Sequence, residues 1–178
     1  MKKIYSIAVP AALSALVLLA CQETPTSPVQ GPASDQLRIS ANGASSGNPR
    51  ATGGGTTEEL GEKSTFTFNA IQHKDGTVNG HMVYQFRFAD LGIHMEIDCL
   101  NIIGNQATLS GTVTQVTGDA PSFIFVGQKA VFKVQDNGEG GDAPPDLISD
   151  VFLFASATCN VPFPAPYLPI DGNIQVSG

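Results

Sequence analysis

The chain has 178 residues, with 16 acidic and nine basic side chains, and its formal net charge is −7. Residues 1–20 carry two lysines and no acid, so their removal would leave a net charge of −9. A surface of this charge repels phosphate groups, which excludes nucleic acid and anionic lipid surfaces from the expected partners.

The N-terminal residues have the order of a secretory signal peptide. Lys2 and Lys3 precede an apolar run over residues 7–19, which is too short to span a bilayer permanently. The run ends in Leu18-Leu19-Ala20-Cys21, and this ending resembles the lipobox of bacterial lipoproteins. In that family the signal is cut before the cysteine, which then carries acyl chains on its thiol and its amine. An ordinary soluble secreted protein is the alternative.

The lipobox resemblance implies an address in the bacterial cell envelope. Residues 1–20 would be the signal peptide, and Cys21 would hold the protein to the membrane through its acyl chains, several of which are needed for lasting anchorage. Gln22 follows the cysteine where an aspartate would be the inner-membrane signal. This resembles lipoproteins sorted to the outer membrane, if the host has one.

Residues 22–61 are rich in Pro, Ser, Thr, Gly, Ala and Gln and contain almost no residue suited to a core. Gly53-Gly54-Gly55 lies near the end of this segment. Together with Cys21 the segment is predicted to form a flexible tether over residues 21–61. A single domain over residues 62–178 would follow it.

Within residues 62–178, apolar side chains recur at every second position, and Gly, Asn and Asp interrupt the runs at short intervals. This pattern predicts an all-β fold, either an antiparallel β-sandwich or a small β-barrel of about eight strands. A three-residue loop at Lys74-Asp75-Gly76 would place Phe68 opposite Met82. A turn over residues 89–92 would place Phe86 opposite Met95, and a change of inward phase predicts a β-bulge near Cys99.

The later strands follow from the same alternation. Residues 123–125 are expected to pair with residues 130–134 across a turn at Gly127-Gln128. Residues 147–155 are apolar on both faces, which suits a central strand, and residues 173–177 offer a last short one.

Assigning Cys21 to lipid leaves Cys99 and Cys159 as a pair in an oxidising compartment, where a disulfide is the default expectation. Two buried free thiols are the alternative. A zinc or redox role is not expected, because the chain has no C-x-x-C pair and no further ligands at metal spacing.

The most distinctive segment of the domain is acidic. Asp136, Glu139, Asp142 and Asp146 lie within eleven residues that also hold glycines and prolines. Carboxylate oxygens on a flexible loop are the ligands that Ca²⁺ takes, so a structural calcium site is one hypothesis, although the spacing differs from an EF-hand loop. A solvated connection between strands is the other.

The sequence contains none of the common signatures of hydrolases, metalloproteases or phosphate-binding loops, so it predicts neither an enzyme nor a cofactor apart from that calcium ion. Residues 98–105, 132–140 and 144–149 resemble a group of secreted bacterial β-domains of unassigned activity. The resemblance implies an exported accessory domain for envelope structure or extracellular binding. A barrel-type carrier of a small apolar ligand is the rival hypothesis, and the sequence names neither a protein nor a small-molecule partner.

Overall fold

The computed structural model describes residues 47–59, 61–160, 162 and 164–178. The predicted signal peptide, Cys21 and most of the predicted tether lie outside the described residues. The described part is built of strands and one short 3-10 helix, η1 (Arg87–Ala89). The strands are β1 (Arg50–Glu59), β2 (Glu62–Gln72), β3 (Val78–Phe86), β4 (Leu91–Ile103), β5 (Gln106–Gly118), β6 (Lys129–Gln135), β7 (Leu147–Ser149), β8 (Phe152–Leu153) and β9 (Tyr167–Ser177).

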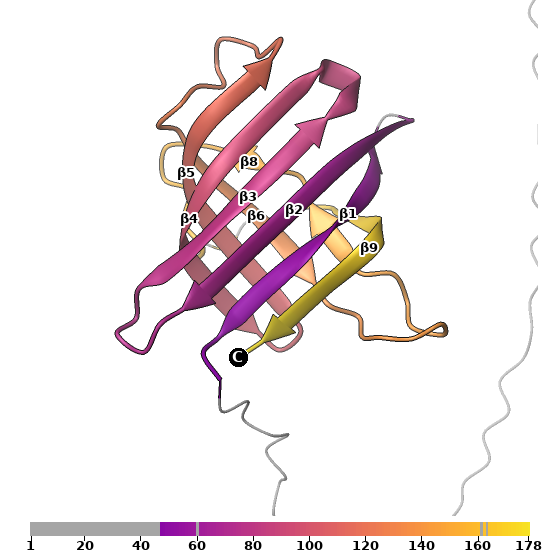
Figure 1. The fold of residues 1–178 in the computed structure, drawn as a ribbon. Coiled ribbons are helices and arrows are strands. Elements are labelled where there is room, and N and C mark those ends of the chain that lie inside the picture. The colour runs from indigo at the N-terminus through magenta and orange to yellow at the C-terminus, as the bar shows by residue number, and fades with distance from the viewer. Residues whose placement is uncertain (1–46, 60, 161, 163) are drawn as a thin grey trace, which may run out of the picture. The chain divides into compact units, whose positions relative to one another are not determined.

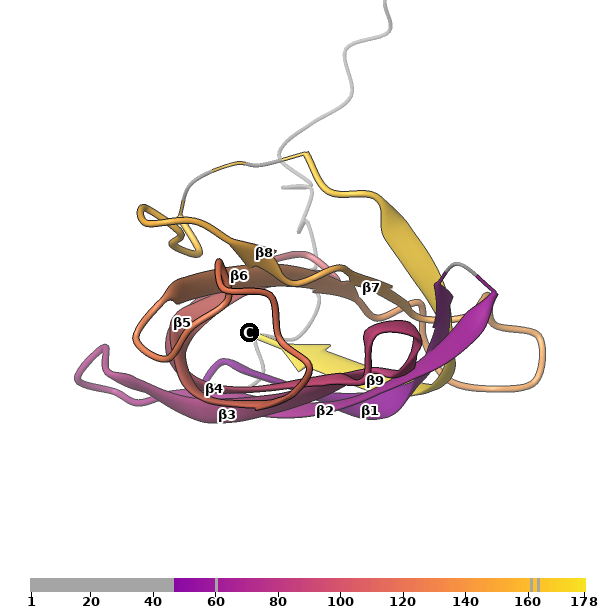
Figure 2. The same cartoon turned by 90° about the horizontal axis from the view of Figure 1, so that it is seen from above.

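Eight of these strands close into an antiparallel barrel. The hydrogen-bonded order runs β5-β4-β3-β2-β1-β9-β7-β6, and an additional pairing of β5 with β6 closes the ring (Figure 1). The short β8 pairs with β6 beside the ring. Seen from above, β1–β4 form one wall and β6–β8 the other, while β5 and β9 join the two walls (Figure 2). The predicted all-β class is therefore confirmed, and of the two predicted architectures the structure has the barrel.

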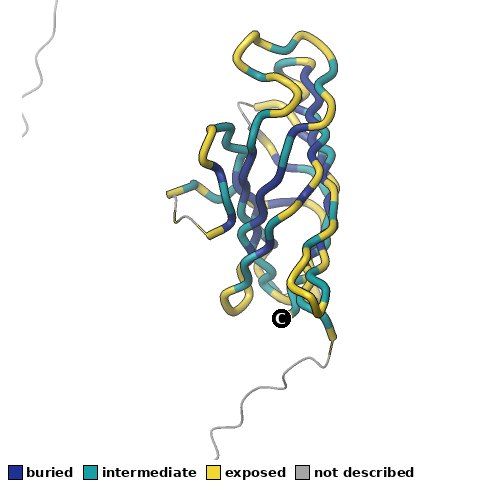
Figure 3. The backbone as a smooth tube through the Cα atoms, turned by 90° about the vertical axis from the view of Figure 1, so that its left-hand side faces the viewer, coloured by how far each residue is buried: buried dark blue, intermediate teal, exposed yellow. Residues whose placement is uncertain are grey.

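The interior of the barrel is filled with side chains. Tyr84, Phe132, Met82 and Met95 are all at most 1% exposed. Aromatic rings pack in a row through the core: Phe132 meets Phe68 edge-on with a centroid distance of 5.4 Å, and Tyr84 stacks on Phe86 at 4.3 Å. Buried residues lie along the strands, whereas exposed residues are concentrated in the loops at the strand ends (Figure 3). Large apolar side chains at alternating positions therefore make this core, as their periodicity predicts.

The predicted tether is wrong from Arg50 onward, because residues 50–59 form β1 between β2 and β9. Gly53 lies opposite Phe68 and Ile174. A Cβ atom on Gly53 would lie 2.7 Å from Ile174 Cγ1 and 2.9 Å from Phe68 Cε1. Gly53 therefore has no room for a side chain, because Phe68 and Ile174 of the neighbouring strands occupy that space, whereas a Cβ atom on Gly55 would meet the backbone of Asp171 and Gly172. The glycine-rich composition of residues 50–59 therefore resembles that of a flexible linker, although these residues form a strand.

The two hairpin registers had different outcomes. Phe68 pairs with Met82 across a turn with Gly76 in the left-handed conformation, at φ 87°, so the first prediction is confirmed. In this turn Thr77 donates two hydrogen bonds to the carboxylate of Asp75, one from its hydroxyl and one from its backbone N–H. Both bonds lower the pKa of the Asp75 carboxyl group, and the hydroxyl bond has the larger effect.

The second register is wrong by four residues, because Phe86 pairs with Leu91 and Met82 with Met95. The chain reverses early through η1, with Asp90 in the left-handed conformation at φ 44°. The bulge predicted near Cys99 is confirmed by a register shift between Ile97 and Cys99, and a second shift follows His94.

The later strands also depart from expectation. Residues 123–125 lie in a loop instead of a strand, and β6 pairs with β5. The predicted strand over residues 147–155 is interrupted at Asp150 and Val151, so that β7 and β8 pair separately with the same edge of β6. The last predicted strand, residues 173–177, is part of the longer β9.

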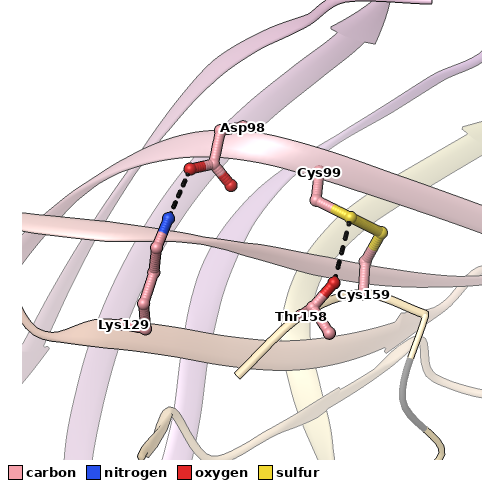
Figure 4. A network of polar contacts seen from close by, with 5 residues as sticks. All are labelled: Asp98, Cys99, Lys129, Thr158 and Cys159. Carbon is pink, nitrogen blue, oxygen red and sulfur yellow. Dashed lines mark hydrogen bonds and ion pairs between the residues drawn. A yellow bond between two sulfur atoms is a disulfide. The ribbon is translucent and has the colours of Figure 1, made fainter. Parts of the chain in front are cut away.

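The predicted disulfide between Cys99 and Cys159 is present, with a Cα–Cα distance of 5.6 Å (Figure 4). It joins β4 to the segment between β8 and β9, and Asn101 Nδ2 adds a hydrogen bond of 3.3 Å to the carbonyl of Cys159. An ion pair of 2.7 Å between Lys129 and Asp98 lies nearby, but both side chains are half-exposed, so it contributes at most about 1 kcal/mol. The disulfide therefore ties Cys159 covalently to β4, and it closes a long loop of the chain.

Candidate functional site

The strand directions give the barrel two different ends. Strand β1 begins and β9 finishes at one end, together with the β2–β3 and β4–β5 turns; we call this the terminal end. The opposite end carries η1 and the loop over residues 119–128 between β5 and β6; we call this the loop end. The C-terminus and the β5–β6 loop lie at opposite ends in Figure 1.

An apolar recess of about 500 Å³ opens at the loop end. Its walls come from the top of the barrel core, from the β5–β6 loop and from the start of β8. The residues that line it are Phe86, Ala89, Leu91, Ile93, Asp119, Pro121, Phe123, Ile124, Asp150, Val151, Phe152 and Leu153. Nearly all of these side chains are apolar, so the recess is built to exclude water from an apolar group.

The β5–β6 loop forms one wall of the recess and holds the most exposed apolar side chains near it. Phe123 is 68% exposed, Val126 60% and Phe125 55%, whereas Ile124 packs against the core. The loop is held to β5 because Gly127 N–H donates to the carbonyl of Val113 and Val113 N–H donates to that of Gln128, both at 2.8 Å. Exposed aromatic groups on a fixed loop indicate a contact surface.

Alternation in the sequence singled out the apolar loop residues but placed Phe123 and Phe125 in a strand. The short run Phe123-Ile124-Phe125 has a strand composition. Its residues instead make local hydrogen bonds, from Ile124 N–H to Pro121 O at 2.9 Å and from Phe125 N–H to Gln128 Oε1 at 3.3 Å. Pro121 before the run and Gly127 after it were the signals for a loop.

Two carboxylates line the recess. Asp119 is exposed at the end of β5, and its backbone N–H donates to the carbonyl of Asp90 at 3.1 Å. Asp150 sits in the break between β7 and β8, and its Oδ1 is buried with no hydrogen-bond partner in the described part of the chain. A buried carboxylate oxygen without a donor is costly, so this atom is a local weakness of the break between β7 and β8.

The structure does not bring the four predicted calcium ligands together. Asp136 and Asp146 face β9: Asp146 Oδ2 accepts from Ile174 N–H at 2.6 Å, and Asp136 Oδ2 accepts from Val176 N–H at 3.0 Å. Their other oxygens accept from backbone N–H groups inside the loop, Asp146 Oδ1 from Asn137 at 2.7 Å and Asp136 Oδ1 from Gly138 at 2.9 Å.

The remaining two predicted ligands lie apart from this network. Glu139 is exposed and contacts Gln175 at 3.4 Å, and Asp142 is exposed. Among the described residues, no group of three or more His, Cys, Asp or Glu side chains is placed to hold a metal ion. The calcium prediction is corrected accordingly, because the carboxylates of Asp136 and Asp146 are used by backbone amides.

A second recess, of about 570 Å³, lies at the terminal end. Gln72, Asn101, Gly104 and Gly178 contribute to it beside Pro49, Leu100 and Ile102, so its lining mixes polar groups and backbone with apolar groups. It lacks the exposed aromatic loop that borders the recess at the loop end. The loop end is therefore the better candidate for a binding site.

Comparison with protein family models, with curated proteins and with solved structures finds no match to the chain. Among the described residues there is no helix with the length and apolar character needed to cross a membrane.

Proposed function

We propose that the protein is a lipid-anchored, non-enzymatic β-barrel of the bacterial cell envelope that binds an apolar group in the recess at its loop end. The observation that supports this most is the combination of an open apolar recess with Phe123 exposed at its border. Burying about 200 Å² of ligand apolar surface there would contribute roughly 5 kcal/mol before the costs of association.

The mouth of the barrel is favoured over its interior as the binding position. A carrier that encloses its ligand needs empty space between the strands. Here Tyr84, Phe132 and Met82 occupy that space and are almost completely buried. The filled core therefore favours a binding module that contacts its ligand at one end of the barrel. It disfavours a carrier that encloses its ligand in the barrel interior.

The proposed anchor precedes the barrel in the chain. The chain enters β1 at the terminal end, and Cys21 lies 29 positions before Arg50. The recess lies at the other end of the barrel from the start of β1. Lipidation at Cys21 would attach the protein to the membrane through the part of the chain that precedes β1.

The anchor is tested by Cys21→Ser. The change should release the protein from the membrane fraction and abolish labelling by an alkyne-tagged fatty acid. An unlabelled parent chain whose fractionation is the same as that of the variant would overturn the lipoprotein assignment.

The recess is tested with the neutral fluorescent probe N-phenyl-1-naphthylamine. Phe123→Ser should weaken probe binding about fivefold to tenfold, because roughly 50 Å² of apolar contact is lost. Ile103→Ser is the matched control, since Ile103 is 74% exposed at the terminal end. If the folded parent fails to bind the probe, or the two variants weaken it equally, the recess is not the binding site.

A further inference from the structure

We propose that the tip of the β5–β6 loop inserts into the apolar layer of a zwitterionic phospholipid bilayer. We call the exposed side chains of Phe123, Phe125 and Val126 the apolar tip. Phe125 and Val126 are not part of the described lining of the recess, so the proposed function gives them no role. A bilayer contact at these two side chains therefore goes beyond the proposed function.

The apolar tip concentrates exposed apolar surface on one short loop. Of the five large apolar side chains that are exposed among the described residues, three form the tip, and their exposed fractions are 55–68%. The other two, Ile71 and Ile103, lie on separate strands. Single exposed apolar side chains are ordinary, but a cluster of this kind indicates a contact surface.

The charges around the tip favour a bilayer without net charge. Residues 120–128 contain no charged side chain, although the chain as a whole has a formal net charge of −7. No charged group must therefore lose its water when the tip enters lipid. An anionic bilayer would repel the acidic chain, whereas a zwitterionic surface would not.

The backbone of the loop is suited to an apolar environment, where a peptide N–H group without a partner is costly. Ile124 N–H donates to the carbonyl of Pro121 at 2.9 Å, and Gly127 N–H donates to a carbonyl of β5 at 2.8 Å. Phe125 N–H donates to Gln128 Oε1, and Gln128 N–H donates to the carbonyl of Phe125, both at 3.3 Å. These four N–H groups are satisfied within the protein, so insertion would not leave them without acceptors.

A protein partner fits these features less well than a bilayer. Protein interfaces combine apolar contact with directed hydrogen bonds. The side chains of the apolar tip carry neither donors nor acceptors, and the backbone N–H groups beside them already have partners. A bilayer requires apolar area without directed bonds, which is what the tip provides.

A single tryptophan tests insertion directly, because the chain contains no tryptophan of its own. The exported full chain carries Cys21→Ser, so that no acyl chain contributes, and mass spectrometry confirms that the apolar run over residues 7–19 has been removed. When phosphatidylcholine vesicles are added, the emission of Phe125→Trp should shift to shorter wavelengths, and brominated phosphatidylcholine should quench it.

Ile103→Trp is the matched control for this experiment. Ile103 is 74% exposed at the terminal end, so a tryptophan there should show neither the shift nor the quenching. An unshifted spectrum of Phe125→Trp, or equal changes in the two variants, would overturn the proposal. A protein partner would then be the remaining occupant of the tip.

Vesicle flotation measures how much the tip contributes to binding. Phe125→Ser should lower partition into phosphatidylcholine vesicles about tenfold or more, because roughly 100 Å² of apolar surface no longer enters lipid. Val126→Ser should lower it in the same direction by a smaller factor. Phosphatidylglycerol in the vesicles should weaken binding of the parent chain, and added salt should restore it. Unchanged partition of Phe125→Ser, or tighter binding to the anionic vesicles, would contradict the proposal.

Binding of N-phenyl-1-naphthylamine without vesicles separates the bilayer contact from the proposed function. Phe125→Ser should leave probe binding unchanged, because Phe125 lies outside the described lining of the recess. A parent chain that binds the probe but not the vesicles would overturn the bilayer contact alone. A parent chain that binds the vesicles through Phe125 but not the probe would overturn the recess as a site and support the bilayer contact.

Discussion

The carboxylates of Asp136 and Asp146 complete the edge of β9 beyond the short β7. β7 pairs with β9 only over residues 167–169. Further along β9, the carbonyl of Asp146 accepts from Ile170 N–H at 3.0 Å, and carboxylate oxygens accept from Ile174 and Val176. The acidic loop thus does for β9 what another strand would do. In sequence, a carboxylate-rich turn that binds calcium cannot be told from one whose carboxylates accept hydrogen bonds from distant backbone amides. Here those amides are 28 residues from Asp146 and 40 residues from Asp136.

Asp146→Asn should destabilise the barrel by roughly 1.5–3 kcal/mol. The carboxylate accepts from two backbone N–H groups through its two oxygens, and an amide side chain offers only one acceptor oxygen. Urea unfolding of the disulfide-intact chain measures the loss. Asp142→Asn, at an exposed position of the same loop, should change stability by less than about 0.5 kcal/mol. Equal losses for the two variants would contradict a bonding role for Asp146.

At the scale of the strands, local signals were predictable and long-range ones were not. The β2–β3 hairpin could be predicted because Gly76 fixes the turn and the turn fixes the register. The register of β3 with β4 was wrong by four residues because an even shift leaves every side chain on the same face. Strand β1 was missed because its glycines lack strand propensity, and the crowding of Gly53 by Phe68 and Ile174 of the two neighbouring strands appears only in the fold.

Gly53→Ala tests that explanation of β1. The added methyl group would lie within 3 Å of Ile174 Cγ1 and Phe68 Cε1, inside the filled core, and should cost about 1–3 kcal/mol. Gly54 is the matched control, because its added methyl group would meet nothing closer than 3.3 Å. Gly54→Ala should therefore cost clearly less stability than Gly53→Ala, and it also restricts the unfolded chain. Thermal melts of the two variants should separate them, and an equal shift would show that β1 does not need a small residue on its inner face.

At the scale of the whole molecule, the fold class and the disulfide were predictable, but closure of the barrel and the site were not. The alternation of apolar residues indicates how many strands there are but not which strands pair. Closure needs β1, because it pairs with both β2 and β9. The recess depends on the fold, because Phe86, Ile124 and Leu153 reach it from three separate parts of the chain. In the sequence these residues are separate apolar positions, and only the fold brings them together into one apolar surface.

A pair of truncations tests whether β1 belongs to the folded unit. A chain that begins at residue 47 keeps β1 and should unfold in one cooperative transition with the disulfide intact. A chain that begins at residue 62, the domain boundary predicted from composition, loses β1 and leaves the facing edges of β2 and β9 unpaired. It should bind 8-anilinonaphthalene-1-sulfonate and lose its near-ultraviolet circular dichroism, because the core behind Phe66 and Phe68 is opened. If the chain that begins at residue 62 unfolds cooperatively and does not bind the dye, the barrel closes without its first strand.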